Sequence, residues 1–235
     1  MMAVVAIATL VGCTAAPLPP RHPSASIEPA EPSVSVTRPN PSISAKRSCC
    51  QAALPGPSRS AIVRTAAKLV GATTIMSEGR RIAYDCAGVT RAIFLKHGID
   101  LYDGSTGPPD ANGVRLIHAH MQQHGRLHQS PIPHRGDLVF FDNTWDFNGD
   151  GELNDPLTHV GVVERIDSDG TVIFISRVAA AIQRYRMNLS RPHLHKAADG
   201  RILNDYLRRK HPTDPDDSGR LTGELFSFFG TRLDS

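Results

Sequence analysis

The stretch THVGVVERIDSDGTVIFIS, residues 158–176, indicates how the second half of the chain is built. Two runs rich in β-branched and aromatic residues, 159–166 and 171–176, flank the tetrapeptide DSDG at 167–170. β-Branched and aromatic residues favour strands, whereas Asp, Ser and Gly favour tight turns. The stretch therefore predicts an antiparallel hairpin.

The neighbouring sequence extends this hairpin into a meander and places helices before it. DLVFF and QRYRMNL have the same strand-like composition, and earlier segments carry apolar residues at helical spacing. Helices followed by an antiparallel sheet are the layout of an α+β domain. We expect strands at 137–141 and 183–189, helices within 58–71, 85–98 and 111–124, and a docking helix within 221–230.

The chain begins with an apolar leader, MMAVVAIATLVGC, at residues 1–13. This run is too short to span a bilayer as a helix and resembles the hydrophobic part of a secretion signal peptide. Its end, Leu10 to Cys13, resembles the lipobox of bacterial lipoproteins, although no Lys or Arg precedes it. The resemblance implies export and a lipid anchor on Cys13 that holds the protein at the membrane of the cell envelope. The alternative is a chance apolar start.

Residues 14–58 differ sharply in composition from the rest. They hold ten of the 18 prolines and many serines, with almost no aromatic residues. Such a segment buries too little apolar surface to offset its ordering entropy. We expect a disordered Pro/Ser-rich tether here, followed by one folded domain at residues 59–235.

Composition narrows the classes of partner. The formal net charge is +3, and no run of Lys and Arg with interleaved aromatics is present, so we expect no nucleic-acid partner. The four cysteines, at positions 13, 49, 50 and 86, form no C-x-x-C pair. A structural zinc site is therefore not expected.

Cys86 is the only cysteine within the predicted domain, in the stretch YDCAGVTRAIF at 84–94. Asp85 is suited to cap a helix that starts at Cys86. The free N–H groups and positive dipole end of a helix stabilise a thiolate in the first turn, and the Cys86 amide would help to form an oxyanion hole. The alternative is an inert, buried thiol. A nearby base would favour the catalytic interpretation.

His159 is the best-placed base, because it follows a polar loop and starts a predicted strand. A histidine at a strand edge close to a cysteine at a helix start is a nucleophile–base arrangement.

DCAGVTR, RGDLVFF and THVGVVE occur in this order and resemble the core motifs of NlpC-type and CHAP-type cysteine peptidases and amidases. The resemblance covers roughly residues 60–190. It implies a papain-like α+β fold, with N-terminal helices packed on the antiparallel meander, that acts on amide bonds in bacterial peptidoglycan. By resemblance, Cys86 is the nucleophile and His159 the general base. Ala87 replaces the serine that is usual after the cysteine.

A third polar residue of that family, often His, Asn or Gln, orients the base from the next strand. Hairpin pairing around DSDG puts residues 176–178 opposite His159. Ser176 can accept an imidazole N–H, whereas Arg177 offers no acceptor. We therefore expect Ser176 to orient His159, although a hydroxyl does so less firmly than an amide.

Together these features predict an exported cysteine peptidase or amidase that hydrolyses amide bonds in peptidoglycan or its stem peptides. The chemistry requires no cofactor. One alternative is a catalytically weakened wall-binding module on the same fold, suggested by Ser176. Another is a thiol acyltransferase that uses the same cysteine and histidine.

The acidic loop DNTWDFNGDGELND at 142–155 resembles the first part of an EF-hand calcium loop. Positions 1, 3, 5, 6, 7 and 9 of that pattern are filled, but position 12 is Leu157 instead of the expected glutamate. The alternative to a structural calcium ion is an acidic surface loop that binds none. The candidate ligands are Asp146, Asn148, Asp150, Glu152, Asn154 and Asp155.

Overall fold

The computed structural model describes residues 56–77, 79–104, 111–212 and 214–233. All of them belong to the compact unit Ala52–Ser235. The predicted leader, the lipidation site Cys13 and the tether up to residue 55 lie outside the described residues. None of the helices in the described part is long and apolar enough to cross a membrane.

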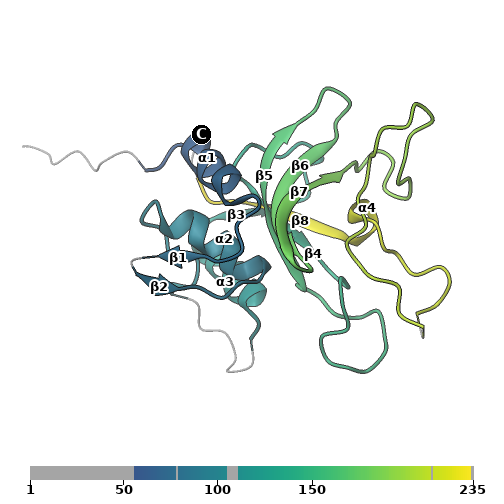
Figure 1. The fold of residues 1–235 in the computed structure, drawn as a ribbon, viewed down its shortest axis with the longest axis horizontal. Coiled ribbons are helices and arrows are strands. Elements are labelled where there is room, and N and C mark those ends of the chain that lie inside the picture. Colours follow the sequence, from purple (N-terminus) through teal and green to yellow (C-terminus); the bar gives the residue numbers. More distant parts are fainter. Residues whose placement is uncertain (1–55, 78, 105–110, 213, 234–235) are drawn as a thin grey trace, which may run out of the picture. The chain divides into compact units, whose positions relative to one another are not determined.

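A six-stranded, fully antiparallel sheet forms the centre of the domain (Figure 1). The predicted hairpin is present as its fourth and fifth strands, and the α+β expectation is confirmed. In order across the sheet, the strands are β3 (Arg126–His128), β8 (Phe226–Thr231), β4 (Leu138–Phe141), β5 (His159–Ile166), β6 (Val172–Val178) and β7 (Ala181–Met187).

Three helices cover one face of this sheet (Figure 1). They are α1 (Arg59–Leu69), α2 (Cys86–Leu95) and α3 (Gly113–His124). Each begins at a side-chain cap, supplied by Ser58, Asp85 and Asn112, which accepts a hydrogen bond from a backbone N–H of the first turn. A short hairpin of β1 (Met76–Ser77) and β2 (Arg80–Arg81) precedes α2.

Alternation along the strands divides the core into two layers. In β4, Leu138 and Phe140 pack against the helices, whereas Val139 and Phe141 pack on the other face of the sheet. Period-2 alternation of this kind gives a sheet that is buried on both sides. The sheet therefore needs a second cover opposite the helices.

Irregular chain between β7 and β8 supplies that cover, and Leu207 packs into the second layer (Figure 1). Fully buried Asn204 organises the segment, because its side chain accepts from the Asn188 N–H and donates to the carbonyls of Arg191 and Leu194. The hydrogen bonds of this buried amide thus satisfy backbone groups that would otherwise need a partner in regular secondary structure.

The predicted docking helix at 221–230 is wrong. Only one turn, α4 (Thr222–Leu225), is helical, and the chain then enters the sheet as β8 between β3 and β4. The aromatic run at 226–229 fits a strand that is packed on both faces, and its Phe229 is fully buried. The edge strand β3 was likewise not predicted.

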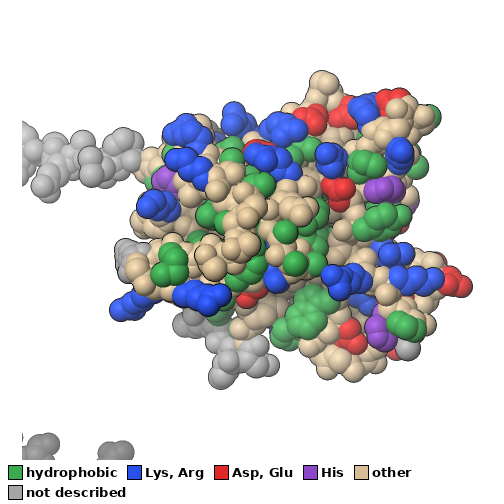
Figure 2. All heavy atoms as spheres, viewed as in Figure 1, with side chains coloured by type: hydrophobic (Ala, Val, Ile, Leu, Met, Phe, Trp, Pro, Cys, Tyr) green, Lys and Arg blue, Asp and Glu red, His purple; other side chains and the backbone are tan. Residues whose placement is uncertain are grey.

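Basic side chains are spread over the face seen in Figure 2, with acidic side chains set among them in several places. The mixture of both signs agrees with the modest net charge of +3.

Asp137, in the RGDLVFF motif, joins the helical layer to the sheet. Its fully buried carboxylate pairs with Arg59 of α1 at 2.7 Å and accepts a hydrogen bond from the His134 N–H, also at 2.7 Å. Its backbone carbonyl accepts from the Val163 N–H of β5. The aspartate of this motif is therefore structural.

We expect Asp137→Asn to lower the free energy of unfolding by about 3 kcal/mol, because it leaves the partly buried Arg59 without its counter-ion. Asp167→Asn is the matched control, since it breaks an exposed pair with Arg165 and should cost less than about 1 kcal/mol. Urea unfolding measures both. Equal losses would show that Asp137 does not hold the layers together.

Candidate active site

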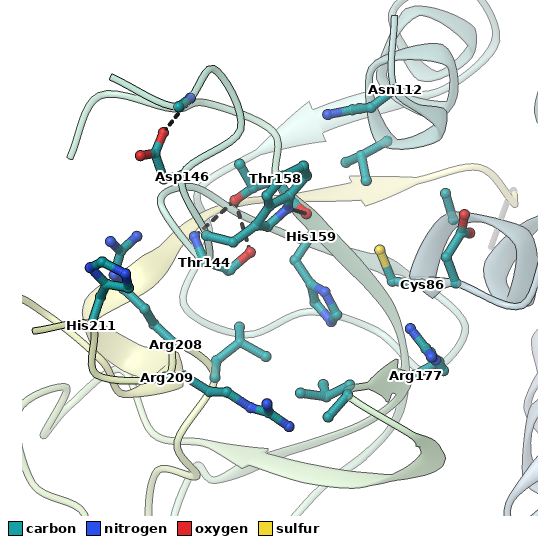
Figure 3. A pocket seen from close by; sticks show the side chains of 18 of the residues that line it. Cys86, Asn112, Thr144, Asp146, Thr158, His159, Arg177, Arg208, Arg209 and His211 are labelled. Atoms are coloured by element: carbon teal, nitrogen blue, oxygen red, sulfur yellow. Dashed lines mark hydrogen bonds between the residues drawn. The ribbon is translucent and has the colours of Figure 1, made fainter. Parts of the chain in front are cut away.

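A cavity of about 1020 Å³ opens where the first turn of α2, the start of β5 and the end of β6 meet. The acidic loop and residues 207–211 complete its wall. Cys86 and His159 both line it, so the structure brings the two predicted catalytic residues to one site. Figure 3 shows Cys86, His159 and Arg177 around one part of the cavity and Arg208, Arg209 and His211 around another.

Cys86 is the first residue of α2, as the sequence predicts. Asp85 caps the helix by accepting the Gly88 N–H at 2.7 Å. A Cβ at residue 88 would overlap the carbonyl oxygen of Ala83, so this turn requires glycine. The small residues after the cysteine therefore allow the chain to fold tightly back at the helix start.

Burial, with a smaller contribution from the nearby carboxylate of Asp85, raises the pKa of the Cys86 thiol to about 11. The backbone N–H groups of Val160, Ala87 and Cys86 itself act in the opposite direction. Desolvation thus outweighs the helix terminus, and the expected stabilisation of a resting thiolate is not found. Val160 directly follows His159, so its interaction with the sulfur brings Cys86 to the start of β5.

His159, the first residue of β5, is buried, and its Nε2 lies 2.9 Å from the hydroxyl of Ser176. That hydroxyl also lies 2.7 Å from the Val160 carbonyl, to which it donates its only hydrogen. Ser176 is then left to accept from the imidazole, which assigns the ring proton to Nε2 and leaves the lone pair on Nδ1. The predicted orienting contact is therefore present.

Gly161 makes this contact possible. The pairing of Val162 with Ile175 puts Ser176 opposite residue 161, which is two residues from His159 along β5. A Cβ on residue 161 would lie 2.7 Å from the Phe174 ring and 3.2 Å from the Ser176 Cβ. Without that side chain, Ser176 reaches along the strand to His159.

Burial, with a smaller contribution from the positive charge of Arg177, lowers the pKa of His159 to about 3. With the pKa of Cys86 at about 11, the pair rests as a neutral thiol and a neutral imidazole over the usual pH range. His159 would therefore take the thiol proton during attack, as a general base.

The neutral resting pair predicts how Cys86 reacts with iodoacetamide. Its alkylation rate should rise about tenfold per pH unit from pH 6 to pH 9, because the thiolate fraction does. Mass spectrometry of the peptide that contains Cys86 measures this rate. A rate that is already constant from pH 5 to pH 8 would indicate a thiolate–imidazolium pair instead.

The neutral, buried imidazole also predicts a loss of stability in acid. The pKa of His159 is near 6.5 in the unfolded chain and lower in the folded one, so unfolding takes up a proton below pH 6.5. Between pH 7 and pH 5 this lowers the free energy of unfolding by about 2 kcal/mol. Urea unfolding at the two pH values should show that His159→Gln loses about 2 kcal/mol less unfolding free energy than the wild type. Equal losses in the two proteins would contradict a buried, neutral imidazole at position 159.

The acidic loop is held by its own backbone. The Asp146 carboxylate accepts from the N–H groups of Gly149 and Gly151, and buried Asp155 accepts from the Phe147 N–H. Within the described ranges, no three His, Cys, Asp or Glu side chains gather as a metal site. Calcium binding stays a prediction, and no step of the chemistry depends on it.

Sequence reasoning missed part of this cavity. Residues 207–211 enter it from the far side of the sheet, where buried Arg208 pairs with Asp214 at 2.8 Å and donates to the Asn143 carbonyl. The basic run at 208–210 was the available signal. Arg177 was considered only as an orienter of His159, for which it has no acceptor.

No protein-family model matches the chain. Among curated proteins, the chain is similar to the gamma-D-glutamyl-L-lysine dipeptidyl-peptidase of Bacillus cereus, at 25% identity over 135 residues. The similar region is 57% of this chain and 34% of the relative, so the chain spans about a third of that protein's length. The chain is thus distantly similar to a peptidase.

Proposed function

We propose that the domain is an NlpC-type cysteine peptidase with a papain-like fold that hydrolyses an amide bond in a cell-wall peptide. The observation that carries the proposal is that Cys86 and His159 line one cavity, while buried Ser176 contacts the imidazole of His159. The relative's name supplies the kind of bond, a γ-D-glutamyl amide. The leader would deliver such an enzyme to the cell envelope through export and acylation of Cys13.

In the proposed reaction, Nδ1 of His159 takes the thiol proton while the Cys86 sulfur attacks the carbonyl carbon. The oxyanion would lie at the start of α2, where the Cys86 N–H is available. The C–N bond then breaks as His159 returns the proton to the leaving amine. Water, deprotonated by His159, hydrolyses the thioester and regenerates the thiol.

Ser176 supports this sequence by fixing the imidazole. As long as its hydroxyl accepts from Nε2, the lone pair of Nδ1 stays available for the thiol proton. The same bond would stabilise the imidazolium that forms during attack. Ser176 thus acts through His159 as a positioning residue.

The full chain should cleave a peptide that contains γ-D-glutamyl-L-lysine, and Cys86→Ala should abolish cleavage. Ser176→Ala should leave KM unchanged and lower kcat by about tenfold to a hundredfold, because a poorly positioned imidazole loses part of the rate enhancement that a general base supplies. Ser168→Ala, in the exposed turn of the same hairpin, is the matched control and should behave as the wild type. Product release is followed by mass spectrometry.

Peptidoglycan binding separates this proposal from the wall-binding alternative. If the wild type and Cys86→Ala bind peptidoglycan equally and neither releases fragments or cleaves the peptide, the domain is a binding module and the enzyme proposal fails. Cleavage that persists in Cys86→Ala would remove the cysteine from the mechanism.

A further inference from the structure

Arg177 occupies the cavity next to the reacting residues but has no role in the steps above. It follows Ser176 in β6 and lies on the same face as Ile175, towards the helices. Arg177 lines the same cavity as Cys86, and its positive charge acts on His159 (Figure 3). A substrate bound at Cys86 would therefore share the cavity with this guanidinium.

The Arg177 guanidinium is positioned by packing. Its Cζ lies 5.1 Å from the centre of the Tyr84 ring. Its Nε is buried without a hydrogen-bond partner, and no residue in the described part of the chain forms an ion pair with it. A buried donor without an acceptor costs free energy, so the site is suited to an acceptor that the chain does not supply.

The carboxylates of the same cavity have other partners. Asp85 accepts from the Gly88 N–H, and Asp146 accepts from two backbone N–H groups. Asp150 accepts from the Glu152 N–H, and Asp214 pairs with Arg208. None of them lies within ion-pair distance of Arg177. An uncompensated guanidinium thus remains in the cavity that holds Cys86.

We propose that Arg177 binds a carboxylate of the substrate, located a few bonds from the carbonyl that Cys86 attacks, and thereby selects acidic acyl groups. Guanidinium and carboxylate match in shape and charge and form paired hydrogen bonds. A γ-glutamyl linkage uses the side-chain carboxyl and leaves the α-carboxylate free near the scissile carbonyl. This inference rests on the proposed function, which it deepens by naming the acidic group that is recognised.

The first experiment needs no hydrolysis. Iodoacetate carries a carboxylate one carbon from its reacting atom, whereas iodoacetamide is its neutral analogue. The iodoacetate-to-iodoacetamide rate ratio at Cys86 in the full chain, divided by the ratio for glutathione, should be about tenfold or more, as expected for a charge-assisted bond. Peptide mapping by mass spectrometry measures the ratio at Cys86.

Arg177→Gln should bring this normalised ratio down to about one, and Arg177→Lys should keep part of it. Arg209→Gln removes the same charge from an exposed side chain of the same cavity and should keep most of the ratio. Equal ratios in the wild type and Arg177→Gln, with both proteins folded by melting curve, would overturn the proposal. Equal losses of the normalised ratio in Arg177→Gln and Arg209→Gln would also overturn the proposal. They would indicate that the positive charge of the whole cavity attracts anions and that Arg177 has no special part in it.

The second experiment uses two peptides that differ only at the α-carboxyl of the γ-D-glutamyl residue, free in one and a carboxamide in the other. The wild type should favour the free acid in kcat/KM by about tenfold or more, and Arg177→Gln should lose that preference. If the wild type cleaves neither peptide, the proposed function fails, while the alkylation ratio still decides whether Arg177 binds carboxylates. Cleavage of both at equal rates would overturn the role in selection.

Discussion

The contact between the first turn of α2 and the start of β5 is the constraint on which the rest of the site depends. The Val160 N–H interacts with the Cys86 sulfur, so helix and strand must approach closely at this point. Two glycines shape the segments on either side of this contact. A side chain at Gly88 would overlap the Ala83 carbonyl at the helix start, and one at Gly161 would press on Phe174 on the other face of the sheet. Both belong to the motifs that carry the family resemblance, and packing explains why they are glycines.

The site combines residues from both faces of the sheet. His159 and Ser176 lie on the face that packs under residues 188–225, as the contact of His159 with Phe141 shows. Arg177 alternates to the helical face, where Cys86 also lies. These faces meet at the open end of the β5–β6 hairpin, opposite its turn, so one hairpin supplies the proposed base, the proposed positioning residue and a cation.

Much of this could be predicted from local sequence. The hairpin, the three helices and the positions of Cys86, His159 and Ser176 follow from periodicity, turn residues and capping, which act over a few residues. Strand β8 could not be predicted in this way, because its aromatic run is a strand only by virtue of its place between β3 and β4. The pKa of Cys86 was also out of reach, since burial by distant segments outweighs the helix terminus.

Electrostatics connects recognition to chemistry at this site. Attack by Cys86 requires His159 to become positively charged, and the unpaired charge of Arg177 opposes that step. A substrate carboxylate bound to Arg177 would cancel this opposition and raise the pKa of His159 as the carbonyl arrives. A neutral ligand would leave the guanidinium uncompensated and the imidazole a weak base. Burial is the larger cause of the low pKa of His159, so an acidic substrate would remove only the part that Arg177 contributes. Proton transfer from Cys86 to His159 would then be easier with an acidic substrate than with a neutral one, which joins the choice of substrate to the chemistry.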